Sequence, residues 1–190
     1  MNKWKVAFFI LAGTILFAIA ALLYLATSPV QQEPLQQQVE AEGNVLTVQT
    51  TAQEFEAIAK QYLGAAMNKT PLPVEIEVED KIYLYSELTI FSIDVPIKMD
   101  FDPIVDNGNI RLKQTAVHVG KLNIQPQTVL KLMNDAIDFP NWITVRPNDE
   151  EIFVDLSRIN IASGSRVRAK EIDLANDNIL LEIIVPADAK

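Results

Sequence analysis

The chain has 190 residues, with 16 basic residues against 25 acidic ones, one histidine and no cysteine. One histidine without cysteine excludes the usual zinc sites, and the net charge of −9 argues against a nucleic-acid ligand. A lipoprotein is excluded as well, because no cysteine is present to carry the lipid.

Residues 6–26 form a stretch of 21 residues without a charge. As a helix that rises about 1.5 Å per residue, this stretch would be about 31 Å long, enough to cross a hydrocarbon core of about 30 Å. Lys3 and Lys5 precede it, and no charge follows until Glu33. We therefore expect residues 1–5 in the cytoplasm, a single transmembrane helix at 6–26 and the rest of the chain outside the cell. The alternative is a cleaved signal peptide, whose apolar part would be shorter, about 7–15 residues.

Residues 29–44 are rich in Gln, Glu and Pro and have no apolar period, which predicts a flexible linker. The remaining residues, 45–190, have the usual size of one domain. Without Lys3 and Lys5, the chain keeps 14 basic residues against 25 acidic ones, a net charge of −11. Such a domain is suited to solubility rather than to tight docking on anionic headgroups.

Two helices are expected in this domain. Thr51 and Glu54 have the spacing of a capping box, and residues 68–71 would end the first helix. Its apolar residues recur at helical intervals: Phe55, Ile58, Ala59, Tyr62 and Leu63. The second helix is expected over 127–136, after Pro126. Its predicted buried side consists of Val129, Leu130, Leu132, Met133 and Ile137.

Period-two alternation of apolar and polar residues predicts strands around these helices. They are expected at 74–79, 82–88, 91–101, 110–119, 143–146, 152–156, 166–174 and 179–185. The strand at 91–101 would be about 36 Å long, and Pro96 within it predicts an edge position or a bulge. Residues 106–109, Asp-Asn-Gly-Asn, predict a hairpin. This order predicts an α+β fold in which a long, curved antiparallel meander sheet packs on one or two helices.

Motifs that carry chemistry are weak. The single histidine, His118, lies in a predicted strand, and no serine occupies a nucleophile elbow. The acidic run at 100–109 lacks the terminal Glu of a calcium-binding EF-hand loop, so the hairpin explains it better. Arg166 and Arg168 share a strand face and would either bind a phosphate or, as we favour, pair with the acidic strand face of the first half of the domain, which carries Glu75, Glu77 and Glu79.

The chain resembles the YpmS family, membrane-anchored proteins of low-GC Gram-positive bacteria, over nearly its whole length. The resemblance rests on the Lys-Trp-Lys start with one anchor, the 91–101 strand followed by Asp102-Pro103, and the stretch Val-Gly-Lys-Leu-Asn-Ile-Gln-Pro at 119–126 before Val-Leu-Lys-Leu at 129–132. The segments Phe139-Pro140 and 152–156 also fit. The family implies no catalytic residues.

The Gly-Lys-Leu-x-Ile-x-Pro stretch that enters a helix after a long meander is similar to the tubular lipid-binding superfamily. That similarity implies a curved sheet around a helix, with acyl chains held between them. An apolar strand face suits such a groove as well as a plain core. The candidate groove residues are Phe55, Ile58 and Tyr62 on the helix and Phe91, Ile93, Val95, Ile97 and Met99 on the strand.

The sequence therefore predicts a membrane-tethered extracytoplasmic domain that binds an envelope lipid or a lipid-linked envelope polymer without catalysis and without a cofactor or metal. The alternative is a scaffold that binds an envelope protein through a sheet edge or an exposed patch. A hydrolase built on His118 and residues 163–165 ranks third.

Overall fold

The computed structural model describes residues 10–18, 20, 43–67, 74–90, 93–120, 124–159, 161 and 164–187. The chain divides into two compact units, Met1–Gln31 and Gln32–Lys190. In the first unit, residues 10–18 and residue 20 are helical. Within the described residues, no helix is both long enough and apolar enough to cross a bilayer. The other residues of the expected 6–26 span lie outside the described residues, as do residues 1–5 and 29–42.

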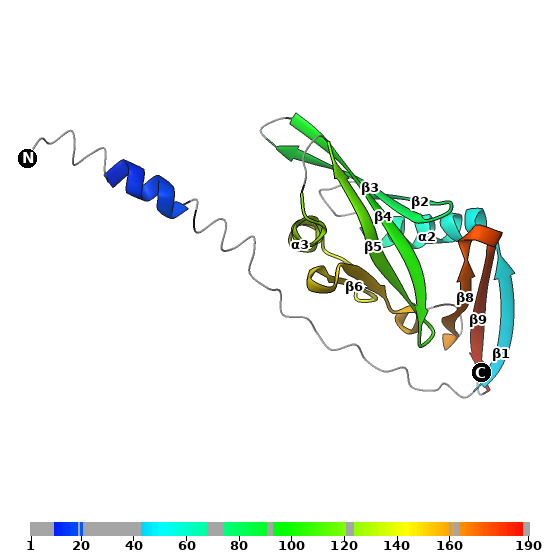
Figure 1. Ribbon diagram of the computed structural model, residues 1–190. Coiled ribbons are helices and arrows are strands. Elements are labelled where there is room, and N and C mark those ends of the chain that lie inside the picture. Colours follow the sequence, from blue (N-terminus) through cyan, green and yellow to red (C-terminus); the bar gives the residue numbers. More distant parts are fainter. Residues whose placement is uncertain are drawn as a thin grey trace, which may run out of the picture. The chain divides into compact units, whose positions relative to one another are not determined.

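The second unit has an α+β architecture with antiparallel strand pairing throughout its described sheets (Figure 1). Its strands are β1 (Gly43–Thr50), β2 (Val74–Val78), β3 (Ile82–Ile90), β4 (Ile93–Asp106), β5 (Asn109–Val119), β6 (Ile143–Arg146), β7 (Glu151–Val154), β8 (Arg166–Asp173) and β9 (Asn178–Pro186). Its helices are α2 (Ala52–Met67) and α3 (Pro126–Ala136), with short 3-10 turns η1 (Pro147–Asp149), η2 (Leu156–Arg158) and η4 (Leu174–Asn176).

The larger sheet has six strands in the order β2-β3-β4-β5-β7-β6. Strands β4 and β5 form its long central hairpin, which is visibly curved in Figure 1. Their turn is as predicted: Asn107 and Gly108 both have positive φ, 50° and 79°, the backbone of a two-residue hairpin turn. A simple meander, however, is wrong for the whole sheet, because β7 inserts between β5 and β6.

Pro96 lies in an internal strand, so the predicted edge position is wrong. Pro96 pairs with Glu87 of β3 on one side, whereas pairing of β4 with β5 begins only at Ile97. The Pro96 carbonyl accepts a hydrogen bond from the Gly120 N–H at 3.2 Å, just past the end of the β5 ladder. In an antiparallel strand the nitrogen and the carbonyl of one residue point to the same neighbour, so the Pro96 nitrogen also faces the β5 side. The proline is tolerated because no ladder bond is needed there; the bulge of β4 lies further on, between Asp100 and Phe101.

A second sheet, β1-β9-β8, was not expected. Gly43 and Asn44, which the sequence assigns to the linker, instead open β1, an edge strand paired along its whole length with β9. The two sheets meet at the β4–β5 turn, where the Ala169 N–H of β8 donates to the Gly108 carbonyl at 2.8 Å. The expected single meander is thus two antiparallel sheets.

Both helices form where they were predicted. At the start of α2, Thr51 Oγ1 accepts from the Glu54 N–H at 3.3 Å and a Glu54 carboxylate oxygen accepts from the Thr51 N–H at 3.4 Å, which confirms the capping box. Helix α3 begins at Pro126 and buries the expected residues Val129, Leu130, Met133 and Ile137. Leu132, expected among them, is 49% exposed, because a step of about 100° per residue places it outside the arc that the others share.

One apolar core lies on the inner face of the six-stranded sheet and is covered by α2, α3 and part of β8. Alternate residues of the strands supply this face, while their polar neighbours form the outer face. Phe101, Met99 and Leu130 have no exposed surface. These side chains are therefore enclosed by protein and do not line an opening that solvent reaches.

Candidate functional site

The strand half of the predicted groove belongs to this core. Ile97 is 8% exposed and Met99 is fully buried, both within the core cluster, and Val95 packs against the cluster while partly buried. Phe91 lies outside the described residues, and Ile93 belongs to β4 with a side chain that is not described. On the described part of β4, the apolar face is therefore covered by protein.

The helix half of the groove divides into a buried and an exposed part. Phe55 packs against the core cluster that contains Ile97 and Met99, whereas Ile58 is 47% exposed and Tyr62 is 36% exposed. The structure thus brings Phe55 together with the strand residues and leaves Ile58 and Tyr62 on the surface of α2.

Glu56 shows how α2 is oriented on the sheet. One of its carboxylate oxygens accepts the Val78 N–H of edge strand β2 at 2.7 Å, and the other pairs with Lys60 at 2.6 Å. These contacts, first the Lys60 hydrogen bond and then the Val78 N–H, hold the pKa of Glu56 below its usual range. At about 100° per residue, Glu56 lies on one flank of the buried stripe of α2, and Ile58 and Tyr62 lie on the other. The two exposed apolar side chains consequently face away from the β2 edge.

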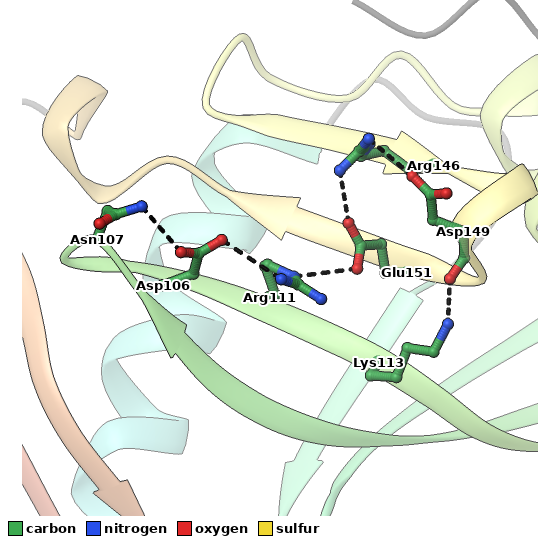
Figure 2. A network of polar contacts seen from close by, with 7 residues as sticks. All are labelled: Asp106, Asn107, Arg111, Lys113, Arg146, Asp149 and Glu151. Atoms are coloured by element: carbon green, nitrogen blue, oxygen red, sulfur yellow. Dashed lines mark hydrogen bonds and ion pairs between the residues drawn. The ribbon is translucent and has the colours of Figure 1, made fainter. Parts of the chain in front are cut away.

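A polar network occupies the outer face where β5, β6 and β7 lie side by side (Figure 2). At its centre, the almost fully buried Glu151 carboxylate accepts from Arg111 Nε at 3.1 Å and from Arg146 Nη1 at 2.7 Å. Arg146 Nη2 also pairs with Asp149 at 2.7 Å, and Arg111 pairs with Asp106 at 3.4 Å. Because these charges are paired with one another, the network acts as a clamp across three strands rather than as an exposed reactive centre.

An open cavity of about 550 Å³ lies over this clamp. Its lining residues are Arg111, Lys113, Gln127, Arg146, Asn148, Asp149, Glu150 and Glu151. Lys113 Nζ donates to the Asp149 carbonyl, which ties the rim of the cavity to the turn before β7. Sequence reasoning missed this cluster, because it began the strand at residue 152, whereas Glu151 is the first residue of β7 and faces the two arginines.

A second cavity, of about 590 Å³, lies on the outer face of β2 to β5. Lys98 and Tyr85 are among its lining residues, and Lys98 Nζ lies 5.6 Å from the ring centroid of Tyr85 and 4.1 Å from that of Tyr83, so the lysine contacts both rings. The Tyr83 hydroxyl donates to Asp80 at 2.7 Å, which raises the pKa of Tyr83 to about 12. His118 borders the cavity with a 62% exposed side chain, and its Nε2 lies 3.9 Å from Asp100.

Arg168 pairs within the protein, as predicted, but the predicted partner, the acidic face of the first half of the domain, is wrong. Its Nε lies 2.5 Å from a carboxylate oxygen of Glu182 on β9, and Lys170 Nζ lies 3.3 Å from the other oxygen. The Arg168 hydrogen bond, opposed by burial and helped by Lys170, holds the pKa of Glu182 below its usual range. Arg168 therefore pairs within its own sheet and not with the glutamates of β2.

Taken together, these features define a small antiparallel α+β domain with internally paired polar clusters. No group of three or more His, Asp or Glu side chains within the described part of the chain could hold a metal ion. The chain belongs to the family described as "Uncharacterized protein conserved in bacteria (DUF2140)", which matches residues 2–185. It is 32% identical over 181 residues to the "Uncharacterized protein YpmS" of Bacillus subtilis (strain 168), covering 94% of this chain and 95% of that protein. No solved structure matches the chain.

The YpmS resemblance predicted from the sequence is thus confirmed. The more distant similarity to tubular lipid-binding proteins stays a prediction, since no solved structure matches.

Proposed function

We propose that this protein is a membrane-tethered domain on the outer side of the cytoplasmic membrane that binds envelope lipids, or lipid-linked envelope polymers, without catalysing a reaction. The uncharged stretch at 6–26, preceded by Lys3 and Lys5, supports the tether and its orientation. A reporter enzyme fused after Lys190 should be active outside the membrane; activity only in the cytosol would refute this topology.

The observation that carries the lipid proposal is the exposed apolar flank of α2. Ile58 and Tyr62 remain exposed although they adjoin the buried stripe of Phe55 and its neighbours. Apolar contact contributes about 25 cal/mol per Å² of surface removed from water, so a strip of this kind attracts an acyl chain without any charged contact. Because Met99 and Ile97 are covered, the acyl chain would lie along the helix flank and not in a closed tunnel.

Native mass spectrometry of the full-length protein extracted in mild detergent tests this proposal. We expect a co-purifying lipid mass that is reduced in the Ile58→Ser and Tyr62→Ser variants. Ile104→Ser is the matched control, since Ile104 is 42% exposed on the outer face of β4. A protein that is consistently free of lipid, or an equal loss in the Ile104→Ser control, would refute lipid binding at α2.

A second candidate, a scaffold for another envelope protein, is favoured by the covered apolar face of β4, because a partner that cannot reach this face must bind to the exterior of the domain. Crosslinking in intact cells tests this candidate. Recovery of one specific envelope protein would support it, and recovery of none would count against it.

A further inference from the structure

Three of the four edge strands of the described sheets are protected against pairing with another chain. Strand β2 carries alternating glutamates, and Glu56 takes its Val78 N–H. Strand β8 carries several charges and a register shift between Ala169 and Glu171, and its Ala169 N–H is used by the β4–β5 turn. Strand β6 is only four residues long. Charges, bulges, short length and covered N–H groups are the devices by which proteins block edge-to-edge association.

Strand β1 has none of these devices. Its sequence, GNVLTVQT, contains no charge and no proline, and its eight residues pair without interruption with β9. All its residues except Thr50 are exposed, including Leu46 at 56%, Val45 at 48% and Val48 at 39%. No described strand pairs with its other edge. An apolar, uncharged, eight-residue edge in an otherwise protected domain indicates an interaction surface.

We propose that β1 pairs antiparallel with β1 of a second copy of this chain, so that the two three-stranded sheets join into one. The sequence of β1 favours this occupant, because the strand is uncharged and Leu46 and Val48 lie at equal distances from Thr47, so that each can face the other residue of a second copy. The charge of the rest of the chain restricts such pairing to this edge. The part of the chain after Lys5 has a net charge of −11, so two copies repel each other over most of their surface. The neutral β1 edge is a place where two copies can approach without placing like charges opposite each other.

The symmetry of such a pair selects the register. A two-fold axis perpendicular to the joined sheet leaves the corresponding faces of the two copies on one side of it. Residues that lie opposite each other across the new strand pair then have side chains on the same face. With the axis at Thr47, Leu46 of each copy lies opposite Val48 of the other, and Asn44 lies opposite Thr50. Two apolar cross-strand pairs then form at once, and they add to the backbone hydrogen bonds of the new strand pair.

The absence of cysteine makes this register directly testable by disulfide formation in the full-length protein in its membrane. In the Thr47→Cys variant, the two new cysteines lie directly opposite each other, at a Cα separation of about 5 Å that suits a disulfide. In the Asn44→Cys control, on the same strand, the two cysteines lie about 20 Å apart. We expect a disulfide-linked dimer for Thr47→Cys and at least about tenfold less dimer for Asn44→Cys.

A second variant tests the contact without new covalent chemistry. Leu46→Glu places a charge in the interface, and it should leave the fold intact because Leu46 is 56% exposed. Light scattering of the detergent-extracted protein should show a dimer for the parent chain and for Ile104→Glu, and a monomer for Leu46→Glu. Equal crosslinking of both cysteine variants, a dimer that survives Leu46→Glu, or a disulfide that links the Thr47→Cys variant to a different protein would each overturn the proposal.

Discussion

The Met99→Ala substitution tests whether the apolar face of β4 is protein core or ligand groove. Met99 is fully buried within the core cluster, so the substitution removes buried atoms and leaves a cavity. Replacing a buried Met by Ala costs about 2–5 kcal/mol of unfolding free energy. For a domain of this size each kcal/mol lowers the melting temperature by about 2–4 °C, so a mid-range loss of about 3 kcal/mol corresponds to about 6–12 °C.

The matched control is Ile58→Ala, which truncates a side chain that is 47% exposed on α2. Its cost should stay below about 1 kcal/mol, because most of what it removes is already in contact with water. Thermal unfolding of the full-length protein in detergent, followed by circular dichroism, measures both variants. A Met99→Ala shift no larger than the Ile58→Ala shift would refute the conclusion that β4 faces a filled core.

Three further predictions concern the polar clusters and the central hairpin. Glu151→Ala leaves two partly buried arginines without their shared carboxylate and should lower the unfolding free energy by about 3–5 kcal/mol, as measured by urea titration. A loss below about 1 kcal/mol would mean that the clamp does not stabilise the fold. Arg168 lowers the pKa of Glu182, so the stability from this contact is complete above the ordinary carboxyl pKa of 4.5 and is lost as the pH falls through the lower pKa of the folded state. Glu182→Gln should therefore flatten the dependence of the melting temperature on acidic pH, and parallel curves for the variant and the parent chain would contradict this. Gly108→Ala forces a side chain into φ +79° and should cost about 1–2 kcal/mol, whereas Asn107→Gly should be nearly neutral; equal effects would contradict the turn geometry.

Elements specified by local sequence were predicted well. The Thr51–Glu54 capping box and the turn at Asn107-Gly108 depend only on residues a few positions apart, and both form as expected. The same reasoning missed β1, because Val45, Leu46 and Val48 place apolar side chains on both faces and blur the period-two signal. Its partner β9 is also far away in sequence, and local periodicity does not indicate which distant strands pair with each other.

Burial in the candidate site could not be predicted for a related reason. Alternation shows that Ile97 and Met99 share a face with Val95, but whether that face is covered depends on how α2 and α3 pack across the sheet. Leu132 is a different case, since at about 100° per residue it lies outside the arc that the buried residues share, and its 49% exposure follows from the spacing itself. The Glu151 clamp requires β7 to lie between β5 and β6, an order that the sequence of strands does not reveal.

The filled core restricts where binding can occur on the described surface. With Met99 and Phe101 fully buried, the flank of α2 and the edge strand β1 each carry more than one exposed large apolar side chain, whereas Ile104 and Leu132 are exposed singly among the described side chains of their elements. These surfaces differ chemically: the first is a strip of side chains on a helix, and the second offers backbone groups that require another strand. The two proposals are therefore separable in one set of variants. Leu46→Glu should abolish the dimer and keep the lipid, and Ile58→Ser should lose the lipid and keep the dimer; loss of both properties in either variant would mean that the two surfaces act as one.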